Sequence, residues 1–197
     1  MGLYPKVVED LITRLTKLPG IGPRSAERIV NFLLAEGETE VLALAENITA
    51  LKKEVQLCQQ CFNLSDGPLC SICQDPRRKN ILCVVEQVKD LVVLERAGYS
   101  GFYHVLGGCI SILERVHPED LHVAALLERL KTHKFEEVIL ATNPTREGED
   151  TAAYLSSLLK EMGIKHSRIA CGLPVGAEIE YMDMQTLKKS LEGRKPL

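Results

Sequence analysis

The sequence has no long apolar run and no excess of positive charge. None of its apolar stretches reaches the roughly 18 residues of a membrane-spanning helix, and Met1 to Pro5 are not a basic segment leading into an apolar core. We therefore expect a protein that stays in the cytoplasm. Its 24 lysines and arginines face 27 aspartates and glutamates, a net charge of −3, so any nucleic-acid surface must be a local patch.

Cysteine is sparse outside one short segment. The chain holds seven cysteines, and Cys83, Cys109 and Cys171 each stand alone in apolar surroundings. A thiol in such a place behaves as a small hydrophobic group. We therefore expect no cysteine nucleophile in this protein.

The other four cysteines form two Cys-x-x-Cys knuckles, which are Cys58 with Cys61 and Cys70 with Cys73. Two such knuckles can place four thiolates around one ion, the arrangement of a structural zinc site. The short loop between them carries turn residues and no apolar periodicity, so metal binding would be part of its folding. Disulfides are the alternative, disfavoured by a reducing cytosol, and a redox motif would need only one knuckle.

The knuckles divide a chain of 197 residues that is 45% hydrophobic, enough for one medium domain or two small ones. We expect a helical domain over residues 1–55, the four-cysteine zinc motif over 56–78, an α/β domain over 79–174, and a C-terminal segment over 175–197. Residues 187–191 of this last segment predict a short helix, which packs either against its own domain or against a neighbouring molecule.

Apolar periodicity predicts helices over 6–18 and 23–35, joined by Pro19-Gly20-Ile21-Gly22-Pro23. We expect Gly20 and Gly22 to take positive φ and let the backbone approach a ligand closely. Free amides at the start of the second helix favour an anion, and Arg24 and Arg28 add charge one turn apart. The hairpin therefore favours binding to a DNA backbone without reading bases, although a plain helix-helix turn would carry the same glycines.

A third helix over 38–51 should complete the helical domain. After the knuckles, short apolar runs predict four strands alternating with helices, which favours a mostly parallel sheet with helices on both faces. Sites in such folds lie at the carboxyl ends of strands. Glu86 and the loop 142–149 occupy these places. The expected strands cover 80–85, 102–106, 137–141 and 166–170, and the expected helices cover 88–97, 118–131 and 146–162.

The order of hairpin, four-cysteine motif and α/β domain resembles the RecR family of bacterial recombination mediators, whose second half is a Toprim domain. The resemblance spans nearly the whole chain. The sequence differs from the family pattern at 112–117, where the family is expected to have a loop richer in glycine and proline. The segments that carry the resemblance are 18–28, 84–86, 103–108, 141–149 and 172–176, with Glu180 and Tyr181 downstream.

In catalytic Toprim enzymes, a glutamate after the first strand does acid-base work and an Asp-x-Asp pair holds magnesium. Here Glu86 matches that glutamate, whereas Asn143 and Thr145 stand where both aspartates should be. Magnesium requires hard anionic oxygens, so we predict a Toprim fold without catalysis. Glu147 and Glu149 keep the loop acidic, either to complement a helix dipole, to dock a protein partner or to bind metal weakly.

The resemblance implies a nucleoid-associated, clamp-like scaffold that binds gapped DNA or single/double-strand junctions and works with RecO and RecF to load recombinase during repair. It also implies a ring-like homotetramer with one structural Zn²⁺ per chain. In that ring the helical N-termini and the C-terminal segments, here 175–197, would contact other copies of the chain. Two other functions stay open from the residues alone. One is a magnesium-dependent Toprim nuclease or nucleotidyl transferase using Glu86, and the other is a zinc adaptor that does not touch DNA.

Overall fold

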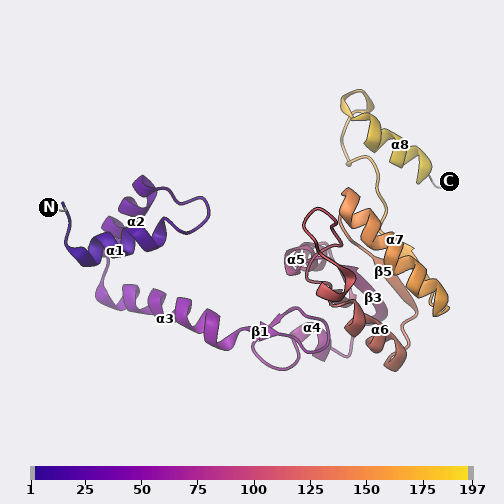
Figure 1. Cartoon of the computed structure of the whole chain (residues 1–197), viewed down its shortest axis with the longest axis horizontal. Coiled ribbons are helices and arrows are strands. Elements are labelled where there is room, and N and C mark those ends of the chain that lie inside the picture. The colour runs from indigo at the N-terminus through magenta and orange to yellow at the C-terminus, as the bar shows by residue number, and fades with distance from the viewer. Residues whose placement is uncertain (1–2, 195–197) are drawn as a thin grey trace. The chain divides into compact units, whose positions relative to one another are not determined.

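The structure is a computed structural model that describes residues 3–194, and these residues form two compact units (Figure 1). The first unit ends at Val55 and the second begins at Gln56. Within the described residues, no helix is long and apolar enough to cross a membrane.

The first unit consists of helices α1 (Lys6–Leu15), α2 (Pro23–Ala35) and α3 (Glu38–Glu54). α1 packs against α2, and the buried side chains Val8, Ala26 and Val30 lie on the amphipathic faces of these two helices. The predicted first helix was too long, because Thr16 and Lys17 already form a turn and the backbone N–H of Leu18 donates to Leu15 O.

α3 differs from the sequence expectation in its packing. It forms as predicted but none of its side chains is buried, so it adds little to the core of the helical unit. Its large apolar side chains are between 47% and 61% exposed. They are Leu42, Leu44, Ile48 and Leu51.

The second unit is built on a four-stranded parallel sheet in the order β4-β3-β5-β6, which confirms the predicted α/β architecture. A small antiparallel pair, β1 and β2, belongs to the cysteine segment. The strands are β1 (Gln56–Leu57), β2 (Leu64–Ser65), β3 (Lys79–Val85), β4 (Gly101–Val105), β5 (Glu137–Leu140) and β6 (His166–Arg168). The helices are α4 (Ser71–Gln74), α5 (Val88–Arg96), α6 (Val123–Thr132), α7 (Arg146–Glu161) and α8 (Met184–Glu192), with 3-10 turns at Pro118–Asp120 and Ile179–Tyr181.

The two faces of the sheet are covered differently. Because successive side chains of a strand point to opposite faces, Leu82 and Val84 of β3 pack with α6 and α7, whereas Cys83 and Val85 face the other side. On that side α5 shares the cover with the cysteine segment, whose Cys58, Cys61, Cys70 and Ile72 belong to the same buried cluster. The knuckles thus form part of the second unit's core.

The predicted helix over 118–131 is interrupted. Leu121 is extended, with φ −105° and ψ 161°, and it separates the 3-10 turn from α6. The interruption follows from a tertiary contact, since the backbone N–H of His122 donates to Leu106 O at 2.9 Å and ties the chain to the end of β4. Sequence periodicity does not report such a contact.

The loop at 112–117, where the sequence departs from the family pattern, is closed by an antiparallel bridge between Ser111 and Val116. Arg115 takes a positive φ of 55° at its turn. Ile112 and Leu113 at the tip are 92% and 90% exposed. The loop therefore projects two aliphatic side chains away from its own domain.

Candidate functional site

The thiols of Cys58, Cys61, Cys70 and Cys73 form one cluster in which all four Sγ atoms lie within 4.8 Å of one another. Tetrahedral zinc with Zn–S bonds of ~2.3 Å requires sulfur separations of ~3.8 Å, so the cluster fits a single zinc ion. All seven cysteines are free, and the 3.5 Å between the Sγ atoms of Cys61 and Cys70 is too long for a disulfide. The predicted structural zinc site is thereby confirmed as an arrangement of four cysteines.

Hydrogen bonds within the cluster favour the thiolate at Cys70. Those from Cys61 and Cys73 lower the pKa of the Cys70 thiol, whereas the pKa of Cys61 is raised, first by its hydrogen bond with Cys70, and that of Cys73 is raised to about 12. The backbone N–H of Cys70 donates to Cys58 Sγ at 3.4 Å. Donors of this kind favour the thiolate, which is the form that binds zinc.

The first knuckle is fastened to the edge of the sheet. β4 is an edge strand, so one row of its backbone groups has no strand partner, and the N–H of Val105 donates to Cys61 O at 2.8 Å. The next residue, Phe62, takes a positive φ of 62° and stacks on His122 at 3.7 Å between ring centroids. It also makes a T-shaped contact with the buried ring of His104, with 5.4 Å between ring centroids. No pattern in the sequence indicated these attachments.

The hairpin between α1 and α2 presents two exposed cations. Arg24 and Arg28 lie in the first turns of α2, and neither forms an ion pair among the residues that the structure describes. α2 begins with Pro23 and has no acidic residue in its first turn and no side-chain cap. The positive end of its dipole is therefore not neutralised by its own sequence.

The two hairpin glycines play different parts. Gly20 takes the expected positive φ of 78°, with nothing within 4 Å of the place where a Cβ would lie. The expectation for Gly22 was wrong, because this residue is extended, with φ −86° and ψ 172°, and is the N-cap of α2. Its carbonyl accepts the first helical hydrogen bond, from Ala26 N at 2.9 Å. Ile21 between them is half-buried.

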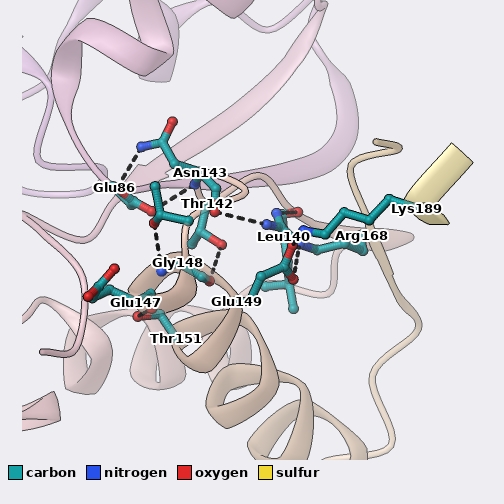
Figure 2. A network of polar contacts seen from close by, with 11 residues as sticks. Glu86, Leu140, Thr142, Asn143, Glu147, Gly148, Glu149, Thr151, Arg168 and Lys189 are labelled. Atoms are coloured by element: carbon teal, nitrogen blue, oxygen red, sulfur yellow. Dashed lines mark hydrogen bonds and ion pairs between the residues drawn. The ribbon is translucent and has the colours of Figure 1, made fainter. Parts of the chain in front are cut away.

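The carboxyl ends of β3 and β5 bring Glu86 and Asn143 together, as Figure 2 shows. Glu86 is 7% exposed. Its Oε1 accepts from the backbone N of Asn143 at 2.7 Å, and its Oε2 accepts from the Asn143 Nδ2 at 2.6 Å. Both carboxylate oxygens thus bind the neighbouring loop, and the amide at position 143 acts as a donor.

Thr145 also has a structural partner. It is the N-cap of α7, and its Oγ1 accepts from Gly148 N at 3.1 Å. Gly148 itself allows the close approach, since a Cβ there would lie 2.1 Å from Asn143 O and 2.7 Å from Glu86 Oε1. A glycine in the first turn of a helix, where it lowers helix propensity, was the signal in the sequence that could have identified this contact.

The two remaining acidic residues of the loop differ in their surroundings (Figure 2). Glu149 forms ion pairs with Lys189 of α8 at 2.9 Å and with Arg168 of β6 at 3.6 Å. The hydrogen bond from Lys189 and the charge of Arg168 lower the pKa of Glu149. Glu147 points away from this group and is half-buried, and among the described residues its carboxylate has no hydrogen-bond or ion-pair partner.

Two of the three cysteines outside the knuckles, Cys83 and Cys109, have raised pKa values. Cys83 is buried, and burial raises its pKa to about 12. Burial also raises the pKa of Cys109, with a contribution from nearby Glu86 and Glu147. These surroundings disfavour the thiolate that a nucleophile requires.

Models of known protein families match the chain almost from end to end. A RecR helix-hairpin-helix model matches residues 8–52, and a RecR four-cysteine zinc finger model matches 55–75. A Toprim domain model then matches 80–170, and a model of the RecR C-terminal part matches 172–195. Hairpin, zinc cluster and acidic loop each lie within one of these matches.

Whole proteins show the same similarity. The chain is 50% identical to the recombination protein RecR of Carboxydothermus hydrogenoformans and 47% identical to that of Tropheryma whipplei strain Twist, over 98% of both chains in each case. It is 48% identical to the recombination protein RecR of Thermobifida fusca over 99% of both chains. With this identity over the full length and a matching four-cysteine cluster, the chain belongs to the RecR family.

Proposed function

We propose that this chain is a non-enzymatic recombination mediator that binds DNA through its hairpin and works with RecO and RecF to load recombinase onto gapped DNA. The observation that carries the proposal is the hairpin itself. Two exposed arginines, without ion-pair partners in the described part of the chain, stand at an uncapped helix N-terminus beside a glycine turn that is open to close approach. Phosphate groups fit that surface, because the backbone amides at the helix N-terminus and the arginine charges both favour an anion.

The acidic loop supports a role without catalysis. Magnesium-dependent phosphoryl transfer needs carboxylates that are free to hold the ion, usually one or two beside the substrate phosphates. The polar groups of this loop already have other partners. Glu86 accepts hydrogen bonds from Asn143, Thr145 caps α7, and Glu149 forms an ion pair with Lys189. Among the described residues, the one group of three or more potential metal ligands is the cysteine cluster.

Assembly into a ring-like homotetramer would raise the affinity for DNA, because several hairpins that each bind weakly would bind one duplex at the same time. Exposed apolar side chains on α3 and on the C-terminal segment support contacts between copies. In the C-terminal segment they include Val175, Ile179, Tyr181 and Met184. The mass in solution, with and without DNA, tests this part of the proposal.

The DNA-binding proposal is tested with the double variant Arg24→Ala, Arg28→Ala on gapped DNA at several salt concentrations. We expect weaker binding to all sequences alike, with the salt slope reduced by about one unit for each arginine per engaged subunit. The control is Lys131→Ala, Lys160→Ala, which removes the same charge from two exposed lysines of α6 and α7. Binding equal to that of the unmodified chain would remove the hairpin from the proposal.

Glu147 is the residue of the acidic loop through which a basic partner such as RecO would dock. Its charge is unpaired within residues 3–194, whereas reversing Glu149 would also disturb α8. Calorimetry of RecO with Glu147→Lys should show weakened binding, and Glu161→Lys, at the far end of the same helix, should not. Unchanged affinity for Glu147→Lys would leave that carboxylate as a complement to the dipole of α7.

A further inference from the structure

A buried arginine of the second unit lacks an acidic partner among the residues that the structure describes. Arg129 of α6 is 7% exposed, and none of the ion pairs in this part of the chain includes it. A guanidinium keeps its charge at any pH at which the protein is folded. Burying such a charge is strongly unfavourable unless a negative charge lies nearby.

The direct contacts of Arg129 are uncharged. Its Nη1 donates to Tyr103 O at 2.6 Å and to Gln60 O at 3.3 Å, and its Nε has no hydrogen-bond partner within the described residues. Its Cζ lies 5.4 Å from the centroid of the Phe135 ring. Two carbonyls and one aromatic face orient the guanidinium, but they do not supply the full negative charge that would balance it.

The two carbonyls lie close to the four-cysteine cluster, which can supply the negative charge that Arg129 needs. Gln60 lies inside the first knuckle, next to Cys61, and Tyr103 lies on the edge strand to which the knuckle is fastened. Burial lowers the pKa of Arg129, and the four knuckle cysteines, Cys73 and Cys61 foremost, act against that shift. Four thiolates outweigh the two positive charges of a zinc ion, so the loaded site keeps a net negative charge.

We propose that Arg129 is a positioning residue of the metal centre. Its charge offsets the excess negative charge of four thiolates around zinc, and its Nη1 holds the turn of the first knuckle against β4. The residue reaches the site from α6, 69 positions away from Gln60. Partners of metal ligands act in this way by stabilising the ligands in their charged, correctly oriented form.

Three substitutions separate charge from hydrogen bonding. Arg129→Met keeps an aliphatic side chain but removes the charge and the hydrogen-bond donors. Arg129→Lys keeps the charge. Arg129→Gln keeps a donor for the two carbonyls and carries no charge. Zinc affinity of the full chain is measured by equilibrium competition with a chelator, and cobalt substitution reports the thiolate coordination. Lys131→Met, an exposed residue two positions further along α6, is the control.

We expect zinc to bind about 10- to 100-fold more weakly to Arg129→Met and Arg129→Gln, whereas Arg129→Lys stays within a few-fold of the unmodified chain. If Arg129→Gln binds zinc as tightly as the unmodified chain, charge is irrelevant and the proposal fails. If Arg129→Met does not fold, the comparison of the Lys and Gln variants still decides, because those two differ in charge while each retains a donor.

Discussion

Glu86 and Asn143, which lie 57 residues apart in the chain, are joined by two hydrogen bonds of 2.7 and 2.6 Å. The amide of Asn143 stands where the resemblance to catalytic Toprim enzymes places a carboxylate. Two carboxylates at these positions would repel each other, whereas an amide donor on Asn143 and an acceptor on Glu86 attract. The pair connects the ends of β3 and β5 and fixes the start of α7.

Glu86→Gln should therefore destabilise the second unit while leaving DNA binding unchanged. The new amide nitrogen would face one of the two Asn143 donors, so a buried hydrogen bond is lost. We expect the free energy of unfolding to fall by about 1–3 kcal/mol in urea denaturation. Glu114→Gln, in the exposed loop tip, serves as the control.

Unchanged stability of Glu86→Gln would mean that the hydrogen bonds to Asn143 contribute nothing. A separate assay addresses catalysis. If the unmodified chain nicked supercoiled DNA with magnesium and Glu86→Gln abolished the nicking, the non-catalytic proposal would have to be withdrawn.

Removal of one zinc ligand should unfold part of the second unit. Cys58 is fully buried in the cluster that covers one face of the sheet, so Cys58→Ser leaves a three-ligand site inside a core. We expect loss of bound zinc and aggregation, measured by metal analysis and thermal denaturation. Cys70→Ser should behave alike, and Cys171→Ser, outside the cluster, should retain its metal.

A result against this prediction would be less than about half an equivalent of tightly bound metal in well-folded unmodified protein.

Glu149→Gln should loosen α8. The carboxylate of Glu149 holds Lys189 of α8, and the neutral amide removes that attraction. We expect severalfold faster hydrogen exchange of the amides in α8, with little change in global stability, because the pair is partly exposed. Glu147→Gln is the matched control, since its carboxylate holds no cation among the described residues.

The same ion pair has a pH dependence. The pKa of Glu149 is lowered in the folded chain, so its contribution is present above the ordinary glutamate pKa and is lost as the pH falls through the lowered value. Amide exchange itself slows as the pH falls, so the quantity compared is the protection factor, which corrects for the intrinsic rate at each pH. Acidification should lower the protection factors of the α8 amides in the unmodified chain and not in Glu149→Gln. Equal rates in both proteins at neutral pH would show that α8 is held by other contacts.

His104 should make the second unit sensitive to mild acid. Burial lowers its pKa from 6.5 to about 4 in the folded chain. Between these values the unfolded chain binds a proton that the folded chain does not, so stability falls as the pH falls, by up to about 1.4 kcal/mol per pH unit. Thermal denaturation between pH 7 and about 4.5, with zinc content measured in each sample, tests this.

His104→Gln should flatten that dependence, because its amide can still donate to His122 O, which His104 Nε2 contacts at 2.9 Å, and cannot gain a proton. His117→Gln, at an exposed position, should leave the dependence unchanged. An equally steep loss of stability in His104→Gln would assign the acid sensitivity to other groups, the zinc thiolates first.

The sequence by itself determined the features that depend on near neighbours. The spacing of the cysteines decides whether two thiols can bind one ion, so the four-cysteine site could be predicted. The period at which apolar residues recur distinguishes a helix from a strand, so the hairpin helices and the parallel α/β order could be predicted as well. The missing aspartates at 143 and 145 were visible only through the resemblance to catalytic Toprim enzymes. The sequence-based predictions were wrong at Leu121 and Gly22. The backbone conformation of Leu121 depends on the tertiary hydrogen bond between His122 and Leu106, and that of Gly22 on its place as the N-cap of α2.

Only the tertiary structure decided which groups meet across the chain. Glu86 with Asn143, Glu149 with Lys189, and Arg129 with Gln60 are separated by 57, 40 and 69 residues. Each pair joins different elements, so its contact depends on how helices and knuckles pack on the sheet, and a sequence period carries no such information. The physical reason is that the type of a residue fixes its charge and its hydrogen-bonding groups, whereas the packing of the chain determines which other residue these groups contact.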